Sequence, residues 1–263
     1  MNVITRNLFS LLRSGALNEY EPIEPMSEFK WKRLEQMVNA QHVENTAWKG
    51  VRNHQYDEMM NIPEHLIKES SPTDTQQQPV QLSNRFLNAR LQRILNNERH
   101  AIDTNIGAIE VLNIIINNVS SMLNNGSMLS GLIRLGSYLR NKGDKVEYVK
   151  VENWLNKLHI RRMAQLQGSM LISVFNFEPA DLPFVNRIEP AAHNLVMRSV
   201  EHAANDSAEE WHFRQSRSGF VTNNSTLLRR NLRRSLRYIS YAPIETISNY
   251  FSSFARSLQE IEE

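Results

Sequence analysis

Apolar residues recur at intervals of three and four along most of this chain, which is the spacing of one face of an α-helix. The longest example covers residues 83–124, and the Asn-Asn-Gly sequence that ends at Gly126 stops it. Its length fits one very long helix or two helices in series. No segment alternates apolar and polar positions as a half-buried strand does. The pattern predicts an all-α protein, folded as an irregular multi-helix bundle.

The other periodic segments are separated by short polar or proline-containing stretches, and each predicts a helix. Ser27 has a side chain suited to an N-cap, so one helix is expected to begin there. Further helices are expected at Thr5–Leu17, Val43–Met60, Ser127–Asn141, Tyr148–Leu158, Ile160–Phe175, Glu189–Ala203, in the arginine-rich segment Leu227–Tyr238 and from Ala242 to the end.

The large apolar residues of these helices are the expected core, since burying them is the main driving force of folding. In the final segment, five apolar residues fall on one side of the helix. These five are Ile244, Ile247, Phe251, Phe254 and Leu258. The expected core residues of the earlier helices include Phe29, Trp31, Leu34, Met37, Val38, Phe86, Leu87, Leu91, Ile94, Leu95, Ile102, Ile106, Ile109, Val149, Val151, Trp154 and Leu155.

One stretch lacks periodicity altogether. Residues 69–81 read ESSPTDTQQQPVQ, with two prolines and three consecutive glutamines. Such a composition is typical of a solvated, mobile linker. We therefore expect N-terminal helices in residues 1–68, a mobile linker at 69–82 and the main helical bundle in 83–263, with the two helical parts packed as one unit.

Composition agrees with a helical protein and narrows its chemistry. Glycine accounts for only 9 of 263 residues, fewer than a β-rich or phosphate-loop protein of this size needs for its turns. The absence of cysteine excludes disulfides, thiol catalysis and cysteine-ligated metals. Because no run of about 18 apolar residues occurs, we expect no membrane span. The net charge of +2 confines any contact with nucleic acid to a local patch.

Such a patch exists at Leu227–Tyr238, where five arginines fall within nine residues. At about 100° per residue they share an arc of roughly 140°, and apolar residues occupy the opposite arc. Neighbouring like charges repel, so an anionic counterpart is expected. The candidate anion- or partner-binding residues are Arg229, Arg230, Arg233, Arg234 and Arg237, and the apolar arc consists of Leu228, Leu232, Leu236 and Ile239.

The counterpart of these arginines has three alternatives. Carboxylates of the same chain are available in the segments EYEPIEP, DSAEE and QEIEE. Phosphate or RNA is the second alternative, and an acidic protein is the third. We favour pairing within the chain or with solvent, because aromatic residues that could stack on bases are limited to Tyr238 and Tyr241.

No catalytic, cofactor-binding or metal-binding residues can be assigned. The eight histidines form no HExxH motif and no other strong metal spacing. Gly136 and Ser137 match the Gly-Ser turn of polymerase-β-type nucleotidyltransferases, whose two carboxylates lie one residue apart on a strand and hold metal ions. Here Val149 follows Glu147 at that spacing and Lys150 precedes Glu152, so the carboxylate pair is absent.

Several helical segments resemble those that flank the catalytic sheet in a bacterial family of uncharacterised nucleotidyltransferases. LFSLLRSGALNEY followed by KWKRLEQMVNAQHV is similar to the opening helices of that family. Residues 131–177, from GLIRLGSYLR to ISVFNF, are similar to its post-catalytic helices, and RRSLRYISYAPIETISNYF to its closing segment. The catalytic sheet would fall between about Val119 and Ser130, where only a short connection is present. The resemblance implies a helical shell without the catalytic core.

These observations favour a non-enzymatic, cytoplasmic bacterial protein that acts through protein contacts or self-association, as a core-less relative of a nucleotidyltransferase. The alternative is an RNA- or phosphate-binding protein that uses the arginine-rich segment. An RNase or transferase with unrecognised residues is a third hypothesis.

Overall fold

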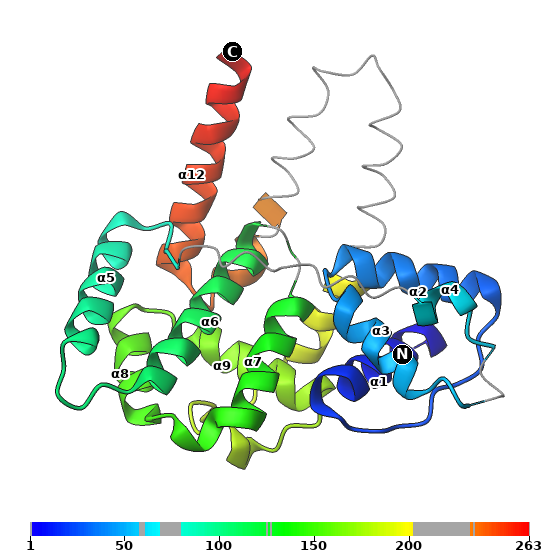
Figure 1. Cartoon of the computed structure of the whole chain (residues 1–263). Coiled ribbons are helices and arrows are strands. Elements are labelled where there is room, and N and C mark those ends of the chain that lie inside the picture. The colour runs from blue at the N-terminus through cyan, green and yellow to red at the C-terminus, as the bar shows by residue number, and fades with distance from the viewer. Residues whose placement is uncertain are drawn as a thin grey trace.

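The computed structural model describes residues 2–57, 61–68, 80–124, 126, 128–201, 232–233 and 235–262. In these ranges every regular element is a helix and no strand occurs, so the all-α multi-helix prediction is confirmed (Figure 1). The elements are α1 (Val3–Leu17), α2 (Glu28–Ala40), α3 (Glu44–Asn53), α4 (Glu64–Lys68), α5 (Arg85–Arg99), α6 (Ile106–Asn124), α7 (Leu129–Lys142), α8 (Tyr148–Lys157), α9 (Arg161–Val174), α12 (Pro243–Glu262) and the 3₁₀ turns η2 (Gly143–Lys145) and η3 (Pro179–Asp181), with further helical residues at 192–201, 232–233 and 235–238.

The long apolar segment forms two helices, α5 and α6, and not one. A turn between them satisfies its polar groups locally. The Thr104 hydroxyl donates to the carbonyls of Glu98 and Ala101, both at 2.7 Å. Asn105 Oδ1 accepts from the backbone N–H of Ala108 at 2.7 Å and caps the start of α6. The break therefore follows from capping residues that the apolar spacing alone does not reveal.

Asparagine residues stand at several helix ends in this protein, including positions after a helix where glycine is common. Asn2 and Asn84 accept backbone N–H bonds at the starts of α1 and α5. Asn18 at the end of α1 and Asn176 after α9 adopt the left-handed conformation, with φ of 56° and 54°. Asparagine tolerates that conformation better than other residues with a side chain. The low glycine content is therefore compatible with well-terminated helices.

Helices α1 to α4 form one end of the molecule, and α5 and α8 lie towards the other end (Figure 1). Polar contacts join the N-terminal helices to the rest. Arg140 of α7 donates to Glu19 at 2.9 Å, and buried Gln41 donates to the carbonyl of Ser199 at 3.1 Å. Most of the predicted linker, residues 69–79, lies outside the described residues. Of its C-terminal end, Leu82 is buried in the core.

Helices α1 and α3 approach each other so closely that their backbones touch at two glycines. A Cβ atom added to Gly50 would lie 2.0 Å from the carbonyl oxygen of Leu11. One added to Gly15 would lie 2.0 Å from the carbonyl oxygen of Thr46. No side chain fits in such a space, so glycine at both positions determines how closely the two helices pack.

Helix α6 is the most apolar element and passes through the middle of the bundle (Figure 1). By length and composition it is apolar enough to cross a membrane, although polar residues interrupt its apolar run. More than half of its most apolar stretch is buried by the surrounding helices, as in the core helix of a bundle. Its buried residues include Val111, Leu112, Ile115, Ile116 and Val119.

The burial of Trp31, Leu34, Val151 and Trp154 agrees with the predicted core. Five other residues that were assigned to the core are exposed. Two positions apart on a helix point in nearly opposite directions, so Phe29 and Val149 cannot face the same way as Trp31 and Val151. The exposed residues are Phe29, Phe86 and Val149, which lie off the buried faces of their helices, and Ile102 and Ile106, at the α5–α6 turn and the start of α6.

Candidate interaction surface

Helix α12 is held to the bundle by its polar side. Glu245, which is buried, accepts the backbone N–H groups of Ser83 at 2.5 Å and Asn84 at 3.1 Å. Asn249, also buried, accepts from the Ser83 hydroxyl at 3.0 Å. These contacts lie at the N-terminus of α5, where the helix dipole stabilises a carboxylate. The polar residues of α12 therefore bind the body of the protein.

The apolar side of the same helix is exposed. Phe251 has 63% of its surface accessible, and Ile244, Ile247 and Phe254 are also exposed. We name these four residues the α12 stripe. At about 100° per residue, its centre lies roughly half a turn from the centre of Glu245, Thr246 and Asn249. These four apolar residues share one side of the helix, as their spacing predicts, and the buried polar groups turn that side outwards.

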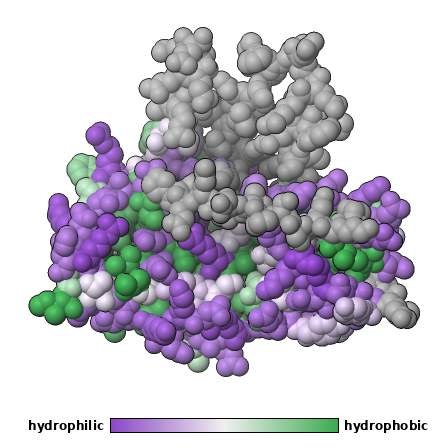
Figure 2. All heavy atoms as spheres, in the orientation of Figure 1, coloured by the Kyte–Doolittle hydropathy of each residue, from purple (hydrophilic) through white to green (hydrophobic). Residues whose placement is uncertain are grey.

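Helix α12 also projects from the bundle, with its C-terminal end far from the other labelled helices (Figure 1). On the face seen in Figure 2, the described surface is mainly polar and its apolar residues lie in separate groups. An apolar stripe on a projecting helix differs from that background. Contiguous exposed apolar surface of this kind typically marks a contact with another molecule.

The segment before α12 is anchored by aromatic residues. Tyr238 and Tyr241 are buried, and the Arg162 guanidinium of α9 lies 5.2 Å from the centroid of the Tyr241 ring. Arg162 also donates to the carbonyl of Ser240 at 3.0 Å. These contacts fix the start of α12 relative to α9.

Three of the four residues of the apolar arc predicted for the arginine-rich segment are described, and Leu228 lies outside the described residues. Leu232, Leu236 and Ile239 are exposed, whereas Ser235 and Tyr238 are buried. The anchoring tyrosine rotates the segment, so a small polar face meets the bundle and the leucines face outwards. Of the predicted anion- or partner-binding residues, Arg233 and Arg237 are exposed, and Arg229, Arg230 and Arg234 lie outside the described residues.

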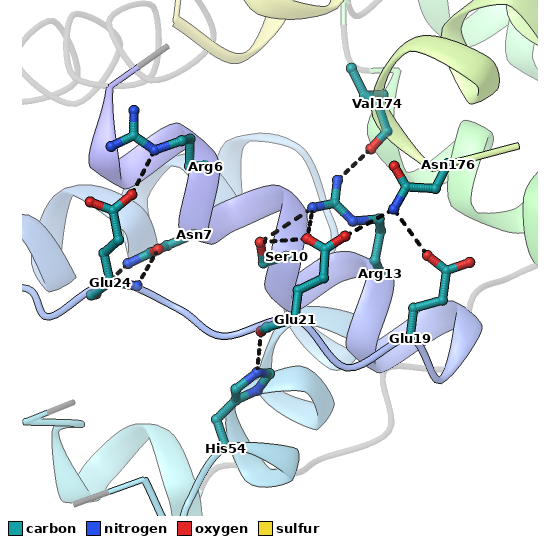
Figure 3. A network of polar contacts seen from close by, with 10 residues as sticks. All are labelled: Arg6, Asn7, Ser10, Arg13, Glu19, Glu21, Glu24, His54, Val174 and Asn176. Atoms are coloured by element: carbon teal, nitrogen blue, oxygen red, sulfur yellow. Dashed lines mark hydrogen bonds and ion pairs between the residues drawn. The ribbon is translucent and has the colours of Figure 1, made fainter. Parts of the chain in front are cut away.

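Among the described residues, the carboxylates of the acidic segment EYEPIEP form no ion pair with the arginine-rich segment. These carboxylates bind arginines of α1 (Figure 3) and the α7 residue Arg140 instead. Glu24 accepts from Arg6 at 2.6 Å, and Glu19 accepts from Arg140 at 2.9 Å. One of the three internal counterparts predicted for the arginine patch is therefore already engaged elsewhere.

Arg13 is the centre of a polar network at the junction of α1 and α9 (Figure 3). Its guanidinium donates to the carbonyl of Val174 at 2.8 Å, to Ser10 at 3.3 Å and to Glu21. Asn176 donates to Glu21 from the other side at 2.9 Å. The network ties the loop after α1 to the end of α9, which is a structural arrangement.

A half-open cavity of about 290 Å³ adjoins this network. Arg6, Arg13 and Glu21 contribute its charged groups, and His193 also lines it. Both arginines are already bound to carboxylates, and the opposite charges cancel locally. The lining therefore lacks the free, convergent polar groups that fix a small ligand.

The Glu21 carboxyl gives this network a pH dependence. Burial alone would raise the pKa of Glu21, but the hydrogen bonds from Arg13, Asn176 and Ser10 outweigh it and the pKa lies below its usual value. A depressed folded-state pKa contributes stability above the unfolded-state pKa, and that contribution is lost as pH falls through the folded-state value.

We expect Glu21→Gln to lower the unfolding free energy at pH 7 more than at pH 3, measured by urea denaturation. Glu201→Gln, at an exposed position, is the control and should change neither value.

A second charged cluster closes the α5–α6 turn onto α8. Lys150 lies 2.9 Å from Glu98, 3.1 Å from Asp103 and 3.3 Å from Glu147. The hydrogen bond to Glu98 is the main reason why the pKa of Lys150 is raised. No group of three potential metal ligands occurs in the described part of the chain.

The Gly136-Ser137 pair lies inside helix α7 and not in a turn after a strand. The Ser137 hydroxyl donates to the carbonyl of Ala16 at 3.4 Å, and Gly136 packs against Phe177. The pair therefore serves helix packing, and the geometry of a nucleotidyltransferase site does not arise here.

Comparisons with known proteins give no match: no family model, no curated protein and no solved structure is significantly similar to the chain. The resemblance of its helical segments to those of a nucleotidyltransferase family stays a prediction. The class defined by the fold is an all-α multi-helix protein.

Proposed function

We propose that this protein acts by binding another protein chain through the α12 stripe. The observation that carries the proposal is the orientation of α12, whose buried Glu245 and Asn249 bind Ser83 and Asn84 while Phe251 faces outwards. A surface helix of a bundle normally buries its apolar face. An apolar face turned away from its own core gains stability when a partner covers it.

A helical partner fits this surface best. The stripe is narrow, with intervals of three, four and three residues, and a helix lies along another helix through such a seam. The proposal agrees with a non-enzymatic role. The proposal also includes that this protein is a relative of nucleotidyltransferases and itself lacks their catalytic core.

Binding of RNA or phosphate is the alternative, and the exposure of Arg233 and Arg237 is the observation that favours it. Phosphate binding releases counterions and weakens steeply as salt increases. A contact made by the stripe depends on apolar burial and has little dependence on salt. The two functions can therefore be separated in one experiment.

The test is recovery of bound proteins from native lysate by tagged full-length chain, with and without nuclease. We expect Phe251→Glu to reduce recovery of the partner at least tenfold, because a charge in an apolar seam is not solvated. Ser252→Glu is the matched control: it adds the same charge at an adjacent exposed residue that is not part of the stripe. Recovery that depends on intact RNA and is indifferent to Phe251 would contradict the proposal and favour the alternative.

A further inference from the structure

We infer that the partner of the α12 stripe is the same helix of a second copy of this chain, running antiparallel. The inference rests on the proposed function and names its partner. It follows from three properties of α12: the period of its apolar residues, the symmetry of their order and the distribution of charge along the helix.

The apolar period is that of a coiled coil. The spacing of the stripe continues in the sequence, so that apolar residues follow one another at intervals of three, four, three, four and three. This heptad spacing of a and d positions keeps two helices in contact along their whole length. The six positions are Ile244, Ile247, Phe251, Phe254, Leu258 and Ile261.

The order of these residues is self-complementary when two copies run in opposite directions. The central pair sets Phe251 of one chain against Phe254 of the other. Moving outwards, Ile247 meets Leu258, and Ile244 meets Ile261. Every layer then joins residues of similar size, and each occurs twice because the arrangement has two-fold symmetry. The same surface patch thus serves both chains.

The residues that flank the seam carry no charge that opposes self-association. In the heptad register the flanking positions of the central part are Ser248, Tyr250, Ala255 and Ser257. Coiled coils that select a different partner use charged residues at these positions. Their absence leaves two identical helices free of repulsion along the seam.

The charge at the two ends of α12 determines the direction. The last turn carries Glu260 and Glu262, and no basic residue balances the negative end of the helix dipole. The exposed Arg233 and Arg237 precede the other end. With 20 residues, α12 is about 30 Å long, so one copy keeps the two groups apart. An antiparallel pair brings the acidic end of each helix beside the basic end of the other.

A parallel pair lacks this compensation. It would place the two acidic ends side by side, where like charges repel. It would also bring both bundles to the same end of the paired helices, because each bundle is joined to the N-terminus of its own α12 (Figure 1). The antiparallel arrangement places the bundles at opposite ends.

The first measurement is the mass of the purified full-length chain by analytical ultracentrifugation. We expect twice the chain mass of 30.6 kDa at micromolar concentration. Phe251→Glu should weaken the dimer at least a hundredfold without unfolding the bundle, because Phe251 is exposed within one copy. Ser252→Glu should leave the dimer intact. A wild-type chain that stays monomeric would overturn the inference.

The direction is tested with cysteines, since the chain has none of its own. Ile244→Cys and Ile261→Cys are prepared as separate full-length variants and treated with a short thiol crosslinker. The antiparallel arrangement predicts crosslinked dimers when the two variants are mixed and few when either is alone. Efficient crosslinking of Ile244→Cys with itself would show a parallel pair and overturn the inference.

A charge exchange tests the pairing of the ends. Replacing both Arg233 and Arg237 with Glu should weaken self-association about five- to tenfold, as expected for a few exposed ion pairs. Mixing this variant with one that carries Glu260→Lys and Glu262→Lys should restore it. Failure of the exchange to restore association would contradict the proposed direction.

These results separate the inference from the function on which it rests. A monomeric purified chain that still recovers another protein from lysate, in a Phe251-dependent way, would leave the proposed function standing and remove the second copy as the partner. A chain that neither dimerises nor recovers a protein through Phe251 would remove both.

Discussion

Replacing Trp154 with alanine is expected to lower the free energy of unfolding by about 3–5 kcal/mol, the usual cost of removing a large ring from a packed core. Trp154 lies on the buried side of α8, next to Leu155 and one turn from Val151. The neighbouring helices can close the resulting cavity only partly, because α8 packs against both α6 and α9. Urea denaturation of the purified chain, followed by circular dichroism at 222 nm, measures the change.

Val149→Ala on the same helix is the matched control for Trp154. Val149 is 70% exposed, so its truncation should change the unfolding free energy by less than about 0.5 kcal/mol. Equal effects of the two substitutions would mean that α8 presents a different face to the core. In that case Trp154 would become a candidate for a contact with another molecule.

The second large effect is expected from a single added methyl group. Gly50→Ala places a Cβ atom 2.0 Å from the backbone carbonyl oxygen of Leu11, so α1 and α3 must move apart. The added group improves the helix propensity of the residue by about 1 kcal/mol. Overpacking against backbone outweighs this gain, and we expect a net loss of about 2–3 kcal/mol in thermal or urea denaturation.

Gly143→Ala is the control for that substitution. Within 4 Å, a Cβ at Gly143 would meet only the Tyr148 hydroxyl, at the end of a side chain that can move. Its backbone is in the right-handed helical region, with φ of −57°, so alanine is tolerated there. If Gly50→Ala were as harmless as Gly143→Ala, the close contact of α1 and α3 would be wrong.

The two predictions test different parts of the bundle. Trp154 reports on the packing of α8 against α6 and α9, and Gly50 reports on the N-terminal helix pair. Neither substitution touches the α12 stripe. The Trp154 and Gly50 variants can therefore test whether a less stable bundle still self-associates. If α12 alone makes the contact, self-association should persist.

Local sequence patterns determined the secondary structure well. The spacing of apolar residues predicted α1, α7, α8 and α9 to within a few residues, because each helix buries one face and that face repeats every 3.6 residues. The division of residues 83–124 into α5 and α6 was left open by the same pattern. It depends on the hydrogen bonds of Thr104 and Asn105, which act over a few residues and leave little trace in the apolar spacing.

The candidate interaction surface could be predicted only in part. The sequence contained the stripe as a row of apolar residues and the exposed Arg233 and Arg237 as a basic patch. It did not decide whether the stripe faces the core, although an apolar helix face normally packs inwards. The signal that could have suggested otherwise is the strict three-four spacing, which is narrower than the apolar face of a core helix.

What the sequence determined by itself is local: that α12 is a helix, and that its apolar residues share one side. Which side meets the bundle was decided by contacts across the chain. Glu245 binds the backbone of Ser83, 162 residues away, at the start of α5. The sequence around α12 does not predict that contact with Ser83. A buried carboxylate must keep its hydrogen bonds, so the tertiary contact fixes the rotation of the helix and leaves Phe251 facing outwards.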